Sequence, residues 1–297
     1  MSPGFSWNLL ADIRNAWAFP FMVNAFRAGA VVAVIAGVMG WFMVLRRQAF
    51  AGHTLSVAAF PGAAGATLIG VSAGYGYFAF CIGAAVLIAA ATRGSRSAGS
   101  LAAESALTGT VQAFTLACGL LFVALYKGFL NGTTALLFGS FLGITAGQVT
   151  VLAAAGGAVI VVLAVIGRPL LFASVDPDVA AGSGVPVRAL SVAFLVLLGA
   201  AVAETAQITG ALLVFALLVM PAATAQRLIP RPLASLVITV AIGWAVTWAG
   251  LIAAYYSPYP IGFYVTTFAF AAYLAAHAAA SARLRIGRRH AFAEVTA

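Results

Sequence analysis

The sequence predicts an all-α polytopic membrane protein with about eight to nine transmembrane helices, and two observations support this fold class. Of the 297 residues, 64% are hydrophobic and 7% are charged, which is too little charge to cover a surface that faces water. The charges also gather in short clusters, and the apolar stretches between them are about 20 residues long. That is the length a helix needs to cross roughly 30 Å of hydrocarbon.

Taken in chain order, nine stretches are long and apolar enough to span a membrane. They cover residues 21–45, 55–72, 75–92, 105–126, 149–167, 189–206, 208–226, 233–255 and 261–282. The stretch 131–147 is apolar, short and rich in glycine, so we expect an external half-helix there. Glu204 and Gln207 interrupt the run from 189 to 226. One of its two segments could therefore be a half-length helix, which leaves the count at eight or nine.

The positive residues predict the orientation of the spans, because arginine and lysine are enriched in cytoplasmic loops. With alternating spans, the arginine clusters at 46–47, 93–96 and 227–231 and the arginine-rich tail all fall on one face. We therefore expect the N-terminus outside and the C-terminus in the cytoplasm. The expected organisation is an interfacial segment at 1–19, a transmembrane domain at 20–283 and a basic cytoplasmic tail at 284–297. The net charge of +9 orients the spans in this reading, and we expect no binding to nucleic acid.

The scarcity of ionisable residues argues against several kinds of transporter. Ion-coupled carriers use ionisable side chains deep in the membrane, and only Arg27, His53 and Glu204 are candidates here. A phosphate loop needs a glycine-rich turn that ends in lysine and then serine or threonine. The single lysine, Lys127, precedes Gly128 in an apolar context. If transport is driven by ATP, we expect the ATPase to be a separate polypeptide.

An intramembrane enzyme is also poorly supported by the sequence. There is no His-Glu-x-x-His motif and no serine with a nearby histidine base. Asp176 and Asp178 lie in an arginine-flanked loop and not inside two facing spans. We expect no catalytic residues, while composition alone leaves a channel or a structural membrane protein open.

Three stretches carry more information than the rest, and the first is residues 45–62. It joins two spans and ends in Pro61-Gly62, so we expect a helix break just inside the membrane. Such a break would turn His53 and Ser56 toward a cavity. The alternative is a positive loop followed by a kinked helix, with His53 in solvent.

The second and third stretches predict a short loop helix and a proline-containing span. Asp176 before Pro177 is a good helix N-cap, and Gly182 or Gly184 is a natural stop. This pattern predicts a cytoplasmic helix at about 175–186, which could dock a motor or be an ordinary capped loop helix. Residues 209–228 form a buried span that contains Met220-Pro221 and predict a proline-kinked helix.

Together these stretches resemble the metal-ion permease family of bacterial ABC transporters, the membrane subunits of zinc and manganese importers. The residues that match the family pattern are Leu45-Arg46-Arg47 and Pro61-Gly62, Asp176 and Ala180 with the glycine that follows, and the run from Gly210 to Pro221 with its Leu-Leu-Val core. Asp178 stands where the family has glutamate. Glu104, which opens a span, also resembles the family pattern. The family is similar in fold to the vitamin B12 and siderophore ABC permeases.

The resemblance implies a permease subunit of an ATP-driven importer in the bacterial inner (plasma) membrane, with no resident cofactor. The transported ion would be a divalent metal, zinc more than manganese. The implied partners are an ABC ATPase subunit, an extracytoplasmic metal-binding protein, the lipid bilayer and a second copy of the chain. The residues implied to couple to the ATPase are Asp176, Asp178, Ala180 and Gly184. The alternatives are an ABC permease for another substrate such as a metal chelate, and an integral membrane protein without transport activity.

One departure from the family pattern concerns the metal path. The family has an aspartate and a histidine four residues apart, and the matching positions here are His53 and Val57. A single imidazole suits Zn²⁺ better than Mn²⁺, which prefers carboxylate oxygens. The expected path residues are therefore His53 and Ser56.

Overall fold

The computed structural model describes residues 17–91, 100–126, 137, 139 and 143–295, with side chains omitted at 91, 100–104 and from 283 onward. Every regular element in these residues is an α-helix. The helices are α2 (Pro20–Leu45), α3 (Ala49–Leu68), α4 (Ala73–Ala91), α5 (Ser100–Leu125), α7 (Ala146–Val175), α8 (Pro177–Gly182), α9 (Val187–Thr209), α10 (Ala211–Leu228), α11 (Pro232–Tyr255) and α12 (Ile261–Val295). The predicted all-α fold class is confirmed.

All nine predicted spans form helices, and eight of them are long and apolar enough to cross a membrane. The exception is α3, which has 20 residues but a more polar composition. The interrupted run contains two full helices, α9 and α10, which meet at Gly210. Gly210 has a φ of 75°, a conformation that glycine adopts without steric cost. The structure therefore supports a multi-pass integral membrane protein without a half-length helix between 189 and 226.

Helix ends follow local sequence signals. Proline occupies the first turn of α2, α8 and α11. At this position a backbone N–H would have no intrahelical acceptor, so proline loses no hydrogen bond. At the start of α7, Thr145 and Gln148 form a reciprocal capping box. Gly184, beyond α8, has a φ of 83° and ends that element.

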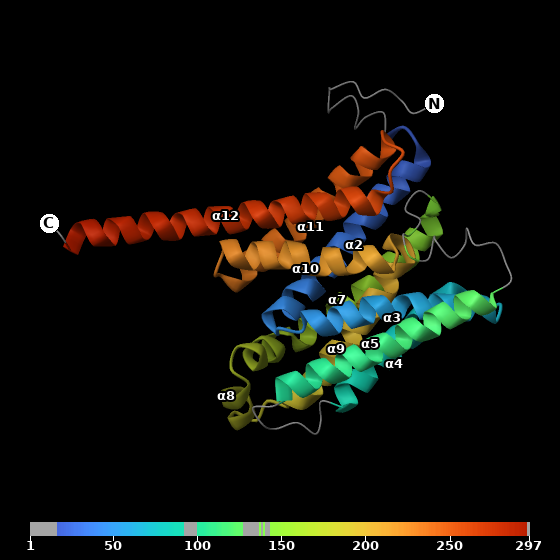
Figure 1. Ribbon diagram of the computed structural model, residues 1–297, viewed down its shortest axis with the longest axis horizontal. Helices are drawn as coiled ribbons and strands as arrows, with labels where there is room; N and C mark the ends of the chain where they lie inside the picture. Colours follow the sequence, from blue (N-terminus) through green and yellow to red (C-terminus); the bar gives the residue numbers. More distant parts are fainter. Residues whose placement is uncertain (1–16, 92–99, 127–136, 138, 140–142, 296–297) are drawn as a thin grey trace.

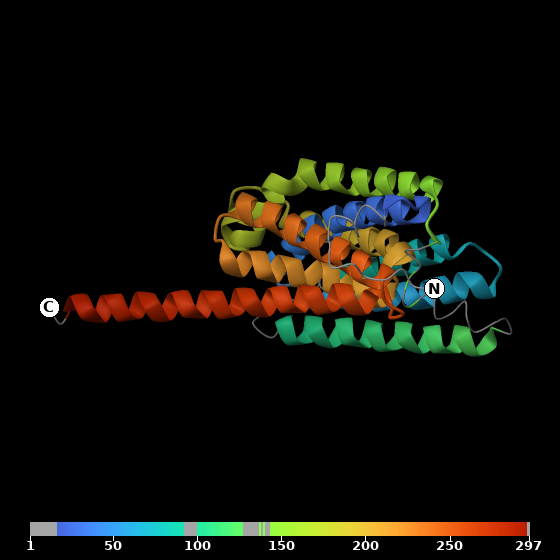
Figure 2. The same ribbon diagram turned by 90° about the horizontal axis from the view of Figure 1, so that it is seen from above.

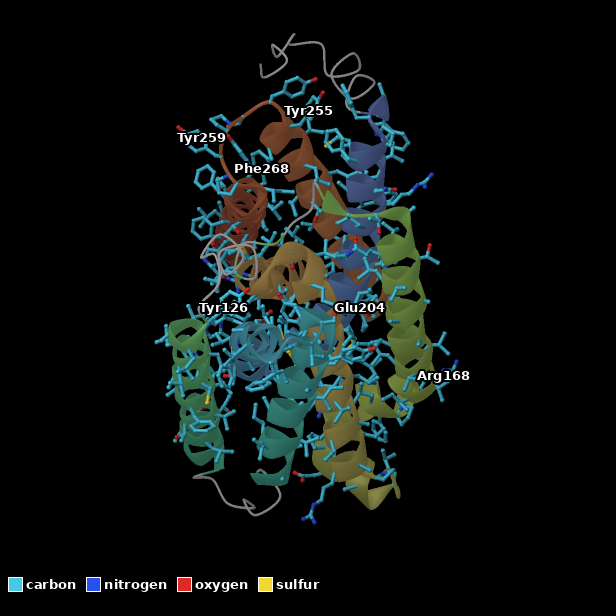
Figure 3. The ribbon with its side chains drawn as sticks, turned by 90° about the vertical axis from the view of Figure 1, so that its right-hand side faces the viewer. Tyr126, Arg168, Glu204, Tyr255, Tyr259 and Phe268 are labelled. Carbon is cyan, nitrogen blue, oxygen red and sulfur yellow. The ribbon has the colours of Figure 1, made fainter. Side chains whose placement is uncertain are left out.

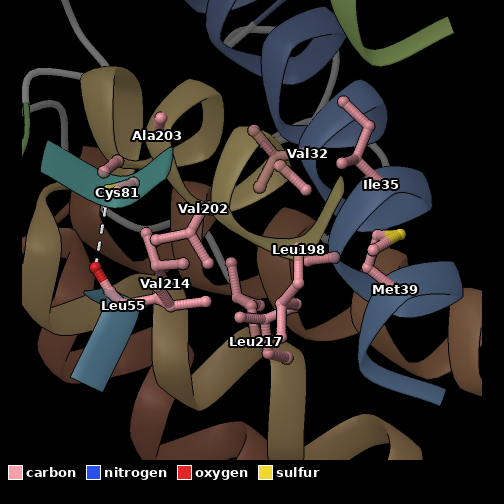
Figure 4. Packing of buried hydrophobic residues seen from close by; sticks show 14 of the residues in the cluster. Val32, Ile35, Met39, Leu55, Cys81, Leu198, Val202, Ala203, Val214 and Leu217 are labelled. Atoms are coloured by element: carbon pink, nitrogen blue, oxygen red, sulfur yellow. Dashed lines mark hydrogen bonds between the residues drawn. The ribbon is translucent and has the colours of Figure 1, made fainter. Parts of the chain in front are cut away.

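The helices pack around a central group made of α2, α3, α9 and α10. Helix α3 packs against α4 and α5, α4 against α9, and α2 against α10 and α11, while α12 covers α10 and α11. Figure 2 shows α7 along one side of the bundle and α5 along the other. Figure 4 shows the interior, where Val202 and Ala203 of α9 lie near Leu55 and Cys81, and the Cys81 thiol donates to the Leu55 carbonyl at 3.5 Å.

Glycines allow the closest helix crossings, as expected where lipid provides no hydrophobic force between helices. A β-carbon on Gly40 of α2 would overlap the carbonyl of Leu218 in α10, and Gly62 of α3 and Gly76 of α4 meet at each other's carbonyls. Small residues at these positions thus hold α2 against α10 and α3 against α4.

The two ends of the bundle differ in what they carry. In Figure 1, α8 and the C-terminal end of α12 lie at the left, and α2 begins at the opposite end. The segment 229–231, between α10 and α11, lies at the α8 end, and the turn between α11 and α12 at the other. Helix α2 therefore begins and α12 ends on opposite sides of the bundle, which requires an odd number of crossings and so includes α3 with the other eight.

Two sequence predictions are corrected or extended by the structure. Pro61 lies inside α3, and the helix continues from Ala49 to Leu68, so the expected break just inside the membrane is wrong. The helix tolerates the proline because neighbouring helices surround it on this buried stretch. Helix α12 continues to Val295, so the predicted tail is an extension of the last span. The segment 1–16 and most of the expected half-helix at 131–147 lie outside the described residues.

Candidate functional site

His53 lies in the second turn of α3, and not in the loop before it. Helix α3 begins at Ala49, six residues before the predicted span. The His53 ring packs edge-on against Phe215 of α10, with ring centroids 4.7 Å apart. Its Nδ1 is buried and has no hydrogen-bond partner among the described residues. The imidazole therefore sits at the contact of α3 and α10 with an unused ring nitrogen.

His53 belongs to an uncovered face made by α3 and α10. On α3 this face carries Phe50, His53 and Val57, each about one helical turn after the one before. All three are at least partly exposed. On α10 it carries Leu212, which is 59% exposed, and the half-buried Phe215. We call these five residues the α3/α10 face. It is apolar except for one imidazole.

Ser56 does not join His53 as a second side-chain ligand. The Ser56 side chain is buried, and its hydroxyl donates to the Gly52 carbonyl at 2.9 Å within the same helix. The Val57 carbonyl is a backbone oxygen that lacks its usual helical donor. Pro61 has no N–H to donate to the carbonyl of Val57, one turn earlier. In the described part of the chain, no group of three or more histidine, cysteine, aspartate or glutamate side chains comes together.

The predicted loop helix is confirmed as α8. Asp176 is its N-cap, and the carboxylate accepts from the Val179 N–H at 3.0 Å. Asp178 is exposed in the first turn and Gly184 follows the helix. Ala180 is fully buried, so it packs α8 onto the rest of the chain. Val179 is the largest exposed apolar residue of α8, with 54% of its surface accessible.

Arg46 links the two long helices that flank α8, a role that sequence reasoning did not identify. Its guanidinium donates to Ser174 Oγ at 3.0 Å and to Ser191 Oγ at 2.7 Å. Ser174 is near the end of α7 and Ser191 near the start of α9, so the two serines flank α8. The guanidinium also lies over the ring of Phe194, 5.3 Å from its centroid. The arginine pair predicted only orientation, because the partner serines are more than 120 residues away in sequence.

Glu204 is the second group whose position the sequence did not reveal. It lies in α9, is 3% exposed, and lines a cavity of about 430 Å³ between α4, α7 and α9. Seen from the end where α2 begins, Glu204 lies inside the bundle while Arg168 on α7 points outward (Figure 3). The sequence identified Glu204 as a polar interruption of an apolar run and as one of three ionisable candidates within the membrane, but it did not predict the cavity.

Comparison with known proteins shows which family this chain resembles. Residues 18–280 match the ABC 3 transport family. The chain is 30% identical over 226 residues to "Manganese transport system membrane protein MntC" of Halalkalibacterium halodurans, covering 75% of each chain. It is 29% identical over 235 residues to "Chelated iron transport system membrane protein YfeC" of Yersinia pestis, covering 79% of this chain and 78% of that one.

A solved structure shows the same fold. The structure titled "PsaBC from Streptococcus pneumoniae in complex with Fab" superposes with a TM-score of 0.79 at 24% sequence identity, covering 90% of this chain and 95% of that chain. The family match extends over nearly all of the described helices and includes all three of the informative stretches. The resemblance that those stretches predicted is confirmed, and the chain belongs to the ABC 3 transport family.

Proposed function

We propose that this chain is the membrane-spanning permease subunit of an ATP-driven importer of divalent metal ions. The observation that supports this most strongly is the family match over residues 18–280. The relatives bearing the names of manganese and chelated-iron transport systems make a metal the expected cargo. ATP hydrolysis belongs to a separate ATPase chain in this proposal, because the only lysine is not part of a phosphate loop.

The proposed docking site for the ATPase is the outward side of α8. A short, capped helix between two long membrane helices can be moved as a rigid unit by a motor that grips it. Asp178 and Val179 are exposed there, and Ala180 anchors the helix from beneath. With α8 on the cytoplasmic side, the positive-inside rule puts the N-terminus outside and the C-terminus inside.

This orientation can be tested by labelling single cysteines in a Cys118→Ala background, since the other cysteine, Cys81, is buried. A membrane-impermeant maleimide should modify Tyr259→Cys in intact cells and modify Ala181→Cys only after lysis. Both positions are exposed, at opposite ends of the bundle. Labelling of Ala181→Cys in intact cells would reverse the proposed topology.

The proposed metal path runs along the α3/α10 face, which a second copy of the chain would cover. Each copy then offers one imidazole and the backbone oxygen of Val57. Two copies related by a two-fold axis present the same face to each other, so two His53 rings would face one channel. An extracytoplasmic metal-binding protein would deliver the ion at the end where α2 begins.

Zinc is the proposed cargo ahead of manganese because the ligand at this position is imidazole nitrogen and not carboxylate oxygen. A site with few ligands also suits a path, because tight coordination would slow release. This assignment differs from the manganese in the name of the relative MntC. It depends on the single substitution of a family aspartate by His53.

The decisive experiment measures zinc and manganese uptake by the complete transporter. His53→Ala should reduce zinc uptake while the complex still assembles, and His277→Ala, at an exposed histidine of α12, should leave it unchanged. His53→Asp combined with Val57→His should shift preference toward manganese. Wild-type zinc uptake by His53→Ala would refute the path assignment, and uptake only of a metal chelate would favour the alternative substrate.

A further inference from the structure

Glu204 is a buried carboxylate that faces no basic side chain within hydrogen-bond distance in the described part of the chain. It is 3% exposed, and neither carboxylate oxygen has a hydrogen-bond partner there. The nearest parts of the neighbouring helices are apolar: a β-carbon built on Gly156 of α7 would meet Ile35 of α2 and come 3.5 Å from Oε2. A lone carboxylate in such surroundings must be neutralised by a proton or by a cation.

The cavity beside Glu204 has room for a hydrated ion. Its volume is about 430 Å³, and its lining includes Phe78 of α4, Thr145 and Gln148 at the start of α7, and Glu204 and Gln207 of α9. One water molecule needs about 10–15 Å³ of such volume, so this space has room for several water molecules. Its lining includes the start of α7, which lies at the end of the bundle opposite α8 (Figure 1).

The polar groups of the cavity are oxygen donors of the kind that hard cations prefer. Gln207 follows Glu204 by three residues, so both lie on one face of α9. The Gln207 Nε2 donates to the Ala203 carbonyl at 3.4 Å, which leaves its Oε1 for a ligand. Thr145 and Gln148 complete a polar rim, although they also bond to each other in the α7 cap.

We propose that this cavity is a cation-binding site in which Glu204 is the anionic ligand and Gln207 a neutral oxygen ligand. The ion is a hard divalent cation that keeps most of its water, as Mg²⁺ does in proteins when one or two carboxylates bind it. Manganese fits this ligand set better than zinc, because the cavity offers oxygen and no sulfur or imidazole nitrogen. The site is separate from His53, which lies on the α3/α10 face, and it joins the ends of α4, α7 and α9.

The test measures Mn²⁺ binding to the purified full-length chain in lipid nanodiscs. Binding is detected as the loss of the free-ion signal in electron paramagnetic resonance. Wild type should bind one Mn²⁺ with saturation, and Mg²⁺ should compete. Glu204→Gln, which keeps the shape and removes the charge, should weaken binding by more than about tenfold. His53→Ala should bind Mn²⁺ as wild type does.

The proposal is overturned if wild type binds no Mn²⁺, which would mean that a proton neutralises Glu204, or if Glu204→Gln binds Mn²⁺ unchanged. Should Glu204→Gln not fold, Gln207→Ala decides: weaker Mn²⁺ binding supports the site and unchanged binding refutes it. Loss of Mn²⁺ binding in His53→Ala would assign the ion to the path and also refute the site. None of these results depends on uptake, so the cation site and the proposed zinc transport can fail independently.

Discussion

Replacing Arg46 by alanine should uncouple ATP hydrolysis from metal transport. Arg46 follows α2 directly and connects, through Ser174 and Ser191, to both helices that hold α8. The same arginine precedes α3, which carries His53. A displacement of α8 by the ATPase therefore has a direct route, through one guanidinium, to the helix that carries the proposed path histidine.

The size of the effect follows from the contacts that alanine removes. A hydrogen bond from a charged donor contributes about 1.5–3 kcal/mol, and a cation–π contact at a partly exposed site about 0.5–1 kcal/mol. Arg46 is half-exposed, so the low end applies, and the two serine bonds alone amount to about 3 kcal/mol. The serines still donate to the carbonyls of Leu170 and Val187, so no buried hydroxyl is stranded. A loss of about 3 kcal/mol allows the connection to open about 100-fold more often.

The assay is the number of metal ions transported per ATP hydrolysed by the complete transporter in proteoliposomes. Arg46→Ala should lower this ratio at least several-fold while ATP hydrolysis continues. The matched control is Arg47→Ala, which removes the same charge from an exposed neighbour in a left-handed conformation, with a φ of 57°. The reasoning is refuted if Arg46→Ala keeps the wild-type ratio, or if Arg47→Ala lowers it equally.

Two glycine substitutions make further predictions. Gly184→Ala should reduce the stability of the α8 segment by about 1 kcal/mol because its φ of 83° is unfavourable for any residue with a β-carbon, whereas Gly182→Ala should not. Amide hydrogen exchange over α8 measures both, and equal protection in the two variants would contradict the prediction. Gly40→Ala should force α2 away from α10 and lower the free energy of unfolding by about 2 kcal/mol. In the control Gly83→Ala the new methyl group meets no other atom, so the melting temperature should equal that of wild type. A Gly40→Ala chain with the wild-type melting temperature would disprove the close crossing of α2 and α10.

Most of the fold was predictable from the sequence because lipid imposes a simple rule on it. A helix in hydrocarbon must be long and apolar, and charges must stay near its ends. The same local logic predicted α8, since Asp176, Pro177 and Gly184 each act on a cap or a turn within a few residues. Signals of this kind need no knowledge of which helices become neighbours.

The site was only partly predictable, because its interactions connect residues far apart in the chain. The Arg46 guanidinium bonds to serines 128 and 145 residues away, and no local pattern contains that information. Glu204 gains its significance from the α7 and α4 residues that share its cavity. The break expected at Pro61 was wrong for a related reason, since the effect of a proline depends on whether neighbouring helices support the backbone around it.

The polar composition of α3 connects the fold to the proposed function. This helix contacts α4, α5, α9 and α10, so most of its surface is shielded from lipid. Its sequence therefore does not need to be as hydrophobic as that of a lipid-facing helix. The helix accordingly contains residues that are unusual in a lipid-facing span: His53, Pro61, and Thr54, whose hydroxyl donates to Gln112 of α5 at 3.1 Å. The placement of the His53 imidazole on the partly exposed side of α3 fits the proposed metal path, and zinc uptake by the His53→Ala transporter tests that proposal.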